Sequence, residues 1–458
     1  MKNKTLLTVV ILMLSSQIIM ASVLSGRAFL GVAGSTSTEN VNGALINRVF
    51  PGGTGEALKL EVGDLITSFN SNEITSFSHL VEDLKSINVG ENIELKVIRN
   101  NESIKLSGSL KARPKESVEA NKSFEVIYDS VNFKNNQLRS IIYRPKLASI
   151  KHKFPAVYFV QGYTCASIDD ALFPNSTSQQ LLKSIADAGY VVYKIEKFGV
   201  GDSIGDLNCS EIDFTTELTG FNAGLDALKS YQFVDNKQIH IFGHSLGGVY
   251  APFIAEHSSV KSLIAYGSVV KSWYDYLLDI YSKQSLIYGT SEKTAQTNRS
   301  LVKPLLRAWL KSDLSWPDIV NSKDVKEAIA SNLVPISGDQ VFQRHYSFFR
   351  DLNRYDLVKT WKNTNSHVLA IHGSLDIQAI DNSWATQMAS LARKNGLKSK
   401  SVVLQGAEHG FMKYESMATY LKARNDRSYN PSQPGELYDQ RVAAIIIDWL
   451  GSISTISE

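Results

Sequence analysis

The chain has 458 residues, of which 43% are hydrophobic, and a formal net charge of +3 at pH 7. This length exceeds one ordinary domain, and the apolar fraction is sufficient for two hydrophobic cores. The charge is small and evenly spread, without a basic stripe that carries interleaved aromatic residues, which argues against a nucleic acid partner.

The N-terminus has the residue order of a secretory signal. Lys2 and Lys4 precede an apolar stretch from Leu6 to Met20, and small residues follow it. This order predicts a signal peptide over residues 1–22 and export to the periplasm or the extracellular space. The apolar part is short for a membrane span of about 20 residues. No stable membrane span is therefore expected after cleavage, and an uncleaved anchor is the alternative.

Residues 27–111 carry the spaced landmarks of a small, mainly β unit. These are the loop Phe29, Leu30, Gly31, Val32, then Gly43 and Ala44, then Pro51, Gly52, Gly53, then Val62 to Ile66, a helix-like stretch Phe77 to Ser86 and an alternating strand Ile93 to Arg99. The set resembles a PDZ domain of the type found in Deg-type exported proteases. The resemblance implies that the loop binds the carboxylate of a protein C-terminus or an extended peptide. A spacer that merely packs is the alternative.

Two short segments connect this unit to the rest of the chain. Residues 112–122 are rich in charge and contain Pro114, which indicates a linker. Residues 123–145 alternate as two strands around Lys134, Asn135 and Asn136, which predicts an antiparallel hairpin.

The most informative motif follows the apolar run Ile239 to Phe242. It reads Gly243, His244, Ser245, Leu246, Gly247. Glycine two places before and after a serine allows a strand to turn sharply into a helix, which leaves the serine hydroxyl exposed. The pattern predicts a nucleophile elbow at Ser245.

Two later segments each deliver an ionisable residue just past a buried strand. The apolar run from Val368 ends at Gly373 and is followed by Asp376, and the run from Val402 is followed by His409. Loops at the carboxyl ends of parallel strands line the ligand crevice of an open α/β sheet. The order serine, acid, histidine therefore predicts that these residues converge, with Asp381 as the alternative acid.

Residues 123–458 as a whole resemble an α/β-hydrolase, closest in pattern to the serine-aminopeptidase and monoglyceride-lipase-like branch. The resemblance implies a doubly wound, mostly parallel sheet with a helical cap. It also implies Ser245 as nucleophile, His409 as general base and then acid, and Asp376 as the carboxylate that orients the imidazole. The expected fold class of the chain is therefore α/β, preceded by the small PDZ domain.

The family also supplies two backbone N–H groups that bind an oxyanion. One belongs to the residue after the nucleophile, here Leu246. The other follows the strand Ala156 to Val160, where Gln161 replaces the usual histidine, and we assign it to Tyr163. The loop Glu196 to Ser203 retains only the glycine skeleton of the family's Asp-x-Arg-Gly-x-Gly-x-Ser turn.

The two cysteines and an insertion complete the expectations for this domain. Cys165 and Cys209 both follow predicted strands on the active-site side, so they could pair as a disulfide or remain two unrelated thiols. Residues 271–361 lose strand character and are expected to form the helical cap. Its aromatic residues could line a pocket, although most are expected in the cap core: Trp273, Tyr274, Tyr281, Trp309, Trp316 and Phe348.

These residues favour an exported serine hydrolase that cleaves a carboxylic ester through an acyl-enzyme. A peptidase acting on short peptides is the runner-up, because the resemblance to PDZ domains implies peptide partners and the hydrolase domain resembles the serine-aminopeptidase branch. An acyltransferase or thioesterase that uses the same serine and a non-catalytic binding protein remain as further alternatives. No metal-ligand cluster or nucleotide-binding loop is evident, so no metal and no cofactor is implied.

Overall fold

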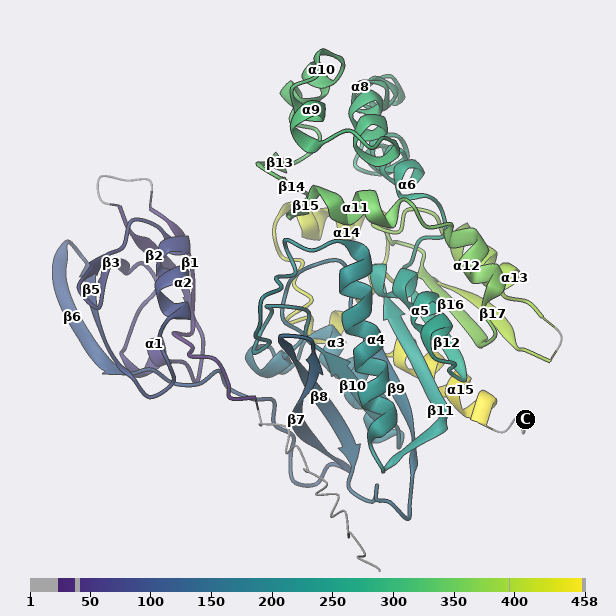
Figure 1. Ribbon diagram of the computed structural model, residues 1–458, viewed down its shortest axis with the longest axis horizontal. Coiled ribbons are helices and arrows are strands. Elements are labelled where there is room, and N and C mark those ends of the chain that lie inside the picture. Colours follow the sequence, from purple (N-terminus) through teal and green to yellow (C-terminus); the bar gives the residue numbers. More distant parts are fainter. Residues whose placement is uncertain (1–23, 38–41, 395, 455–458) are drawn as a thin grey trace, which may run out of the picture.

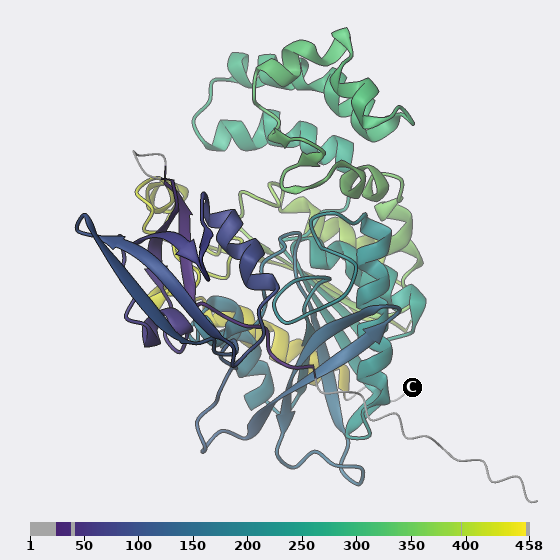
Figure 2. The same ribbon diagram turned by 60° about the vertical axis from the view of Figure 1, so that its left-hand side comes forward.

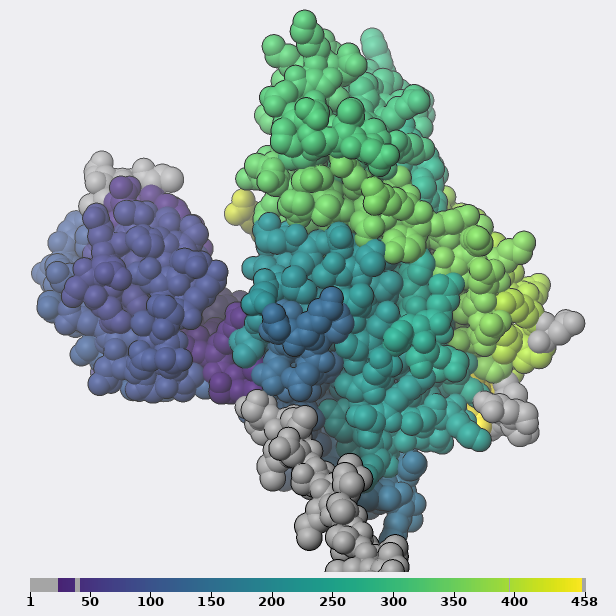
Figure 3. Space-filling view, viewed as in Figure 1, coloured from purple at the N-terminus to yellow at the C-terminus, as the bar shows by residue number. Residues whose placement is uncertain are grey.

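The computed structural model describes residues 24–37, 42–394 and 396–454. The expected signal peptide, residues 1–22, lies outside these ranges. Figure 1 shows a small N-terminal domain beside a larger domain, and Figure 3 shows the narrow waist between the two. Within the described ranges, none of the helices has the length and apolar character needed to cross a membrane.

The N-terminal domain is an antiparallel β structure with two helices. Its elements are β1 (Val32–Thr36), β2 (Ala44–Val49), α1 (Thr54–Ala57), β3 (Leu65–Phe69), β4 (Asn72–Glu73), α2 (Phe77–Lys85), β5 (Asn92–Arg99) and β6 (Glu102–Ser109). The sheet order is β1-β2-β3-β5-β6, and β4 pairs with β3. Alternate apolar side chains of β3 and β5, such as Ile66 and Val97, are fully buried together with Leu80 of α2. One face of the sheet therefore packs on the core, as its period-2 pattern requires.

The larger domain is built on one eight-stranded sheet. Its strands are β7 (Phe124–Phe133), β8 (Asn136–Pro145), β9 (Phe154–Val160), β10 (Val191–Ile195), β11 (Val234–His244), β12 (Ser262–Tyr266), β16 (His367–Gly373) and β17 (Ser399–Leu404). Their order is β17-β16-β12-β11-β9-β10-β8-β7. The predicted hairpin forms β7 and β8, which pair antiparallel, and the other six strands run parallel to one another.

Helices cover both faces of this sheet. On one face, α3 (Thr177–Asp187) packs against α15 (Gln440–Ser454) over a core of buried apolar residues. The other face is covered by α4 (Phe214–Ser230), α5 (Leu246–His257) and α13 (Ser383–Leu391). This is the predicted doubly wound arrangement. After β10 the chain crosses to the opposite side of β9 to form β11, so the carboxyl ends of β9 and β11 border the crevice of an open α/β sheet.

The cap is inserted between β12 and β16 and stands over the carboxyl ends of the strands, as Figure 2 shows in green. It contains α6 (Trp273–Asp279), the π-helical turn η2 (Ile280–Gln284), α7 (Ser285–Ile287), α8 (Glu292–Lys311), α9 (Trp316–Val320), η3 (Lys323–Val325), α10 (Lys326–Ala330), α11 (Tyr346–Leu352) and α12 (Leu357–Asn363). A three-stranded sheet of β13 (Ile336–Ser337), β14 (Gln340–Val341) and β15 (Arg344–His345) also occurs. The sequence did not predict these strands, because two residues are too few to show alternation.

Polar contacts anchor both ends of the N-terminal domain to the larger one. Before it, the Arg27 N–H donates to Asp202 at 2.9 Å. After it, Glu116 of the expected linker, residues 112–122, lies 2.7 Å from the amine of Lys194 on β10. Both side chains of this ion pair are almost fully buried. The segment is therefore fastened to the sheet and is more than a solvated connection.

Candidate active site

Ser245 lies at the sharp turn from β11 into α5. Its backbone has φ +58° and ψ −123°, a conformation that residues other than glycine rarely adopt and that stores strain. The neighbouring glycines make the turn possible. A Cβ at Gly243 would stand 2.3 Å from the Gly247 carbonyl oxygen, and one at Gly247 would stand 1.9 Å from the Val160 oxygen. Side chains at either position would prevent this backbone path.

Asp376 and His409 meet through a hydrogen bond between the loops after β16 and β17. The imidazole Nδ1–H donates to Asp376 Oδ2 at 2.8 Å. The other carboxylate oxygen accepts the N–H groups of Gln378 and Ala379 at 2.9 and 2.8 Å. The carboxylate is thus held from both sides and is 3% exposed. Asp381, the alternative acid, instead accepts from the first residue of α13.

Asp376 and His409 each stabilise the charged form of the other. Burial alone would raise the pKa of Asp376, but the charge and hydrogen bond of His409 overcome it and lower that pKa to about 2. Burial lowers the pKa of His409, and the attraction of Asp376 outweighs it, so the pKa is raised above its usual value. A carboxylate that stays ionised beside an imidazole with a raised pKa favours proton uptake on the ring.

One cavity of about 190 Å³ brings Ser245 and His409 together. Both line its wall, although the structure holds no hydrogen bond between the two side chains. Such bonds are often long in ligand-free active sites and tighten when substrate binds. The three predicted residues therefore lie around one end of the sheet, with Asp376 behind His409.

Two residues that the sequence analysis did not single out support this pair. A Cβ on Gly267, which follows β12 with φ +58°, would stand 2.6 Å from Asp376 Oδ2 and 2.9 Å from His409 Nδ1. His244 donates from Nε2 to the His409 carbonyl oxygen at 2.8 Å. Burial lowers the pKa of His244 to about 3, so its ring stays neutral. The position of Gly267 after a buried strand was the signal that could have identified it.

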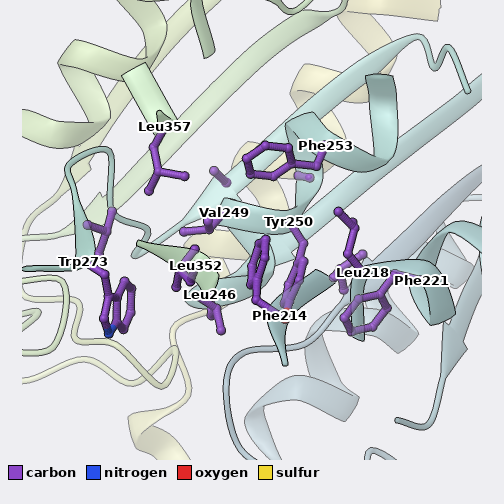
Figure 4. Packing of buried hydrophobic residues seen from close by; sticks show 14 of the residues in the cluster. Phe214, Leu218, Phe221, Leu246, Val249, Tyr250, Phe253, Trp273, Leu352 and Leu357 are labelled. Carbon is purple, nitrogen blue, oxygen red and sulfur yellow. The ribbon is translucent and has the colours of Figure 1, made fainter. Parts of the chain in front are cut away.

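The cavity wall is apolar and aromatic. The cap contributes Trp273, Tyr276, Leu277, Ile280, Gln284, Phe342 and Phe349, and the sheet domain contributes Tyr163, Ser245, Leu246, Val249, Gly267, Val269, Gln378, Ala379 and His409. None of these lining residues is Asp, Glu, Lys or Arg. Of the cap aromatics named from the sequence, only Trp273 is among them. Figure 4 shows it in one apolar cluster with Leu246 and Val249 of α5, while Trp309 and Trp316 lie in the cap core.

The two expected oxyanion donors border the same cavity. Leu246 begins α5, and Tyr163 lies in the loop after β9. Neither backbone N–H meets a hydrogen-bond partner in the described part of the chain. A Cβ on Gly162 would be only 3.1 Å from that of Ser245. The absence of a side chain there lets the loop approach the serine closely.

The two cysteines form a disulfide. Cys165 lies in the loop after β9, just beyond Tyr163, and Cys209 precedes α4, with Cα atoms 5.8 Å apart. Because Cys209 is fully buried, this bond ties the loop after β9 to the interior of the domain.

In the N-terminal domain, the loop Phe29 to Val32 leads into β1. Phe29, Leu30 and Gly31 each offer their carbonyl to a backbone N–H of the segment around α1, and Gly31 has φ +78°. Among the described strands, β1 pairs only with β2, so its other edge is unpaired. Helix α2 packs beside β1, and the ring of Phe77 lies against Gly34.

The described ranges contain no group of three or more His, Cys, Asp and Glu side chains that could hold a metal ion. The geometry at this end of the sheet is that of a serine, a carboxylate–imidazole pair and unpaired backbone N–H groups. Such an arrangement can add a serine hydroxyl to a carbonyl carbon.

Comparisons with solved structures find α/β-hydrolases with low sequence identity. Est1E from Butyrivibrio proteoclasticus, solved with ferulic acid, is 15% identical with a TM-score of 0.41, covering 65% of this chain and 97% of its own. The esterase domain of a Rhodothermus marinus protein is 15% identical with a TM-score of 0.40, covering 72% and 97%. A hyperthermophilic esterase from the archaeon Pyrobaculum calidifontis is 16% identical with a TM-score of 0.41, covering 74% and 86%.

Sequence comparisons identify both domains. A PDZ domain family matches residues 28–110. A probable periplasmic serine endoprotease, DegP-like, of Marinomonas sp. (strain MWYL1) is 34% identical over 97 residues, and the chain spans about a fifth of that relative's length. The X-Pro dipeptidyl-peptidase (S15 family) matches residues 134–430, well over half of the chain. Together with the PDZ match, this confirms the predicted combination of a PDZ domain and a hydrolase domain. The protein therefore belongs to this family of hydrolases.

Proposed function

We propose that the protein is an exported serine hydrolase that cleaves neutral carboxylic esters with a small acyl group. The observation that carries the proposal is the hydrogen bond between Asp376 and His409 at the edge of the cavity that Ser245 lines. Ser245 attacks the carbonyl carbon while His409 takes its proton and Asp376 stabilises the imidazolium. The N–H groups of Leu246 and Tyr163 bind the oxyanion of the tetrahedral intermediate. The intermediate collapses by breaking the bond to the alcohol oxygen, which leaves with the proton from His409. Water, deprotonated by the same imidazole, then hydrolyses the acyl-enzyme and releases the acid from Ser245.

The composition of the cavity favours an ester over a peptide with a free N-terminus. The ammonium group of such a peptide would need a carboxylate partner to compensate its desolvation. The cavity wall contains no Asp or Glu, and the Asp376 oxygens are already bonded to His409 and to two backbone N–H groups. The volume of about 190 Å³ is below the usual range for drug-sized ligands, which favours a short aliphatic or single-ring acyl group.

A dipeptidyl-peptidase activity is the second candidate. The family match over residues 134–430 and the peptide-binding character of PDZ domains favour it. Comparison of p-nitrophenyl acetate, butyrate, benzoate and decanoate with Ala-Pro and Gly-Pro p-nitroanilides separates the two. We expect kcat/KM for acetate, butyrate or benzoate to exceed that for either anilide and for decanoate. Anilide hydrolysis at an equal or higher rate would reverse the choice.

The role of Ser245 has its own test. A fluorophosphonate probe is expected to label the full chain but not the Ser245→Ala variant, and ester turnover is expected to fall by roughly 10⁴-fold or more. Ser416, which caps α14 (Met417–Asn425) and is not among the cavity residues, supplies the control substitution to alanine. Retention of most ester activity by Ser245→Ala would refute the proposed nucleophile.

Export is supported by the charged, apolar and small residues of positions 1–22 and by similarity to a relative named periplasmic. A disulfide is also typical of an oxidising compartment. Cell fractionation with N-terminal sequencing of the product is expected to find the protein outside the cytoplasm and lacking this segment. Cytoplasmic protein with Met1 intact would refute export.

For the PDZ domain we propose binding of a free C-terminus at the loop Phe29 to Val32, with the peptide added as a strand along β1. The unpaired edge of β1 beside α2 supports this proposal. Fluorescence polarisation with a library of C-terminal peptides measures it, and amidated copies are expected to bind at least 10-fold more weakly. No preference for the free carboxylate would favour a spacer role.

A further inference from the structure

Two buried cationic side chains donate hydrogen bonds to backbone carbonyls of the loop after β9. Lys197, just past β10, donates from Nζ to the Gly162 carbonyl oxygen at 2.6 Å. Arg344, on β15 of the cap, donates to the Tyr163 carbonyl oxygen at 2.7 Å. Lys197 and Arg344 are 2% and 1% exposed. Two consecutive peptide groups of this loop are therefore fixed by side chains from distant parts of the chain.

A single carboxylate joins the two cations. Glu217 of α4 lies 2.9 Å from the Lys197 amine and 2.7 Å from the Arg344 guanidinium, and it also accepts from the Tyr250 hydroxyl. Burial lowers the pKa of Lys197 to about 8, against the opposing attraction of Glu217. The amine is therefore mostly protonated at neutral pH. The cluster carries a net positive charge directly behind the loop carbonyls.

The geometry of the peptide bond links these contacts to the cavity. The Gly162 C=O and the Tyr163 N–H belong to one planar trans peptide group, in which they point in opposite directions. A cation bound to the carbonyl therefore fixes the N–H so that it points away from Lys197, in a loop that Gly162 brings close to Ser245. It also polarises the amide, which strengthens the N–H as a donor.

We propose that Lys197 and Arg344, joined by Glu217, are positioning residues that orient the oxyanion-binding N–H of Tyr163. Lys197 orients the peptide that carries this N–H, and Arg344 orients the next peptide and connects the loop to the cap. The inference rests on the function proposed above. It explains how the loop is supported although Gln161 stands where the family usually has histidine.

The substitution Lys197→Met tests this directly. Glu217 keeps Arg344 as an ionic partner in this variant, so no buried charge is left alone. An oxyanion donor acts more strongly on the tetrahedral intermediate than on the planar ester. We therefore expect kcat for p-nitrophenyl butyrate to fall about 10- to 100-fold with KM changed less than 3-fold, somewhat below the loss from deleting a donor outright. Arg344→Met, which leaves Glu217 paired with Lys197, provides a second variant with the same expected direction.

Two matched controls separate positioning from a general structural effect. Lys394 donates to the Asn363 and Thr364 carbonyls at the end of α12, and Arg350 donates to two carbonyls within the cap. Lys394→Met and Arg350→Met remove the same kinds of bond without touching the loop after β9. We expect both to retain kcat within 3-fold.

Inhibitor affinity supplies a readout that loss of stability would not change. An alkylboronic acid forms a tetrahedral adduct with a serine and places an oxygen in the oxyanion site, whereas butyrate remains planar. With the full chain, we expect boronate affinity to fall with kcat in Lys197→Met while butyrate affinity stays within 3-fold. If the wild-type protein is active and both test variants keep its boronate affinity and its kcat, this inference is overturned and the proposed function stands. A folded wild-type protein without ester turnover and boronate binding would overturn the proposed function, and this inference with it.

Discussion

The substitution Gly267→Ala probes the alignment of Asp376 and His409 without removing either. Gly267 follows β12 with φ +58°, and an added Cβ would stand 2.6 Å from Asp376 Oδ2 and 2.9 Å from His409 Nδ1. Gly338, in the turn between β13 and β14, has the same φ of +58° but nothing within 4 Å of the added carbon. Gly338→Ala is therefore a control that shares the backbone strain and lacks the steric clash.

The two effects have different sizes. An L-residue in the left-handed region costs about 1–2 kcal/mol, partly offset by the lower entropy of the unfolded chain. Both variants are expected to lose about 1 kcal/mol of stability from this source. Only Gly267→Ala must also displace its neighbours, by roughly 0.8 Å for the carboxylate oxygen and roughly 0.5 Å for the imidazole nitrogen, to restore ordinary van der Waals contact. A displacement of about 1 Å at reacting groups costs on the order of 10²-fold in rate.

The measurement pairs urea denaturation with steady-state hydrolysis of p-nitrophenyl butyrate for the two variants and the wild type. We expect Gly338→Ala to retain kcat/KM within 3-fold and Gly267→Ala to lose about 10²-fold or more under conditions where both are folded. Equal activity of the two alanine variants would refute the view that the space beside Gly267 is needed to keep the carboxylate and the imidazole aligned.

Three further predictions concern charge and covalent bonding. Because Asp376 raises the pKa of His409, kcat/KM should fall as the pH drops through a value above 6.5. Asp376→Asn should shift this acidic limb of the pH–rate profile to lower pH and reduce kcat by roughly 10⁴-fold. An acidic limb at the same pH in the variant would contradict this prediction. Burial raises the pKa of Glu116, but the attraction of Lys194 outweighs burial, so the pKa in the folded protein lies below the usual 4.5. The ion pair of Glu116 with Lys194 therefore stabilises the folded protein above pH 4.5, and this contribution is lost as the pH falls through the folded pKa. Glu116→Gln should cost about 2 kcal/mol in urea denaturation at pH 7, and this cost should decrease steadily as pH falls below 4.5; a cost that does not decrease with pH would contradict the assignment. Reduction of the disulfide, whose cysteines are 44 positions apart, should lower stability by at most about 4 kcal/mol by the chain-entropy model; an unchanged denaturation midpoint with dithiothreitol would contradict it.

Local patterns in the sequence predicted the fold, and they indicated the loops on which the candidate residues lie. The glycine spacing around Ser245 is typical of a sharp strand-to-helix turn. The apolar runs before Asp376 and His409 indicate buried parallel strands. Since the carboxyl ends of such strands meet at one edge, the three side chains are brought near one another by topology. The sequence also predicted the PDZ domain, because several of its landmarks agree in order.

Contacts between side chains and backbone carbonyls could not be predicted in this way. Any carbonyl can accept a hydrogen bond, so the chemistry of Gly162 and Tyr163 says nothing about which side chain reaches them. Arg344 lies 181 positions from Tyr163 and is carried by a two-residue strand without a recognisable pattern. Glu116 likewise belongs to a charged segment that indicates a solvated linker, and its burial follows from the position of Lys194 on a neighbouring strand.

The hydrogen bonds from the cap to backbone carbonyls have a common physical role. In the cap, the Tyr276 hydroxyl donates to the Gln378 carbonyl and Gln284 donates to the Ile377 carbonyl, both in the loop that holds Asp376. Arg344 makes the corresponding contact to the loop that carries Tyr163. The cap is therefore hydrogen-bonded to the loop on each side of the cavity, and it also forms the apolar part of the cavity wall. Because the same insertion encloses the substrate and fixes both loops, a change that displaces the cap should lower kcat together with substrate affinity, whereas a lid that only covers the cavity would change affinity alone.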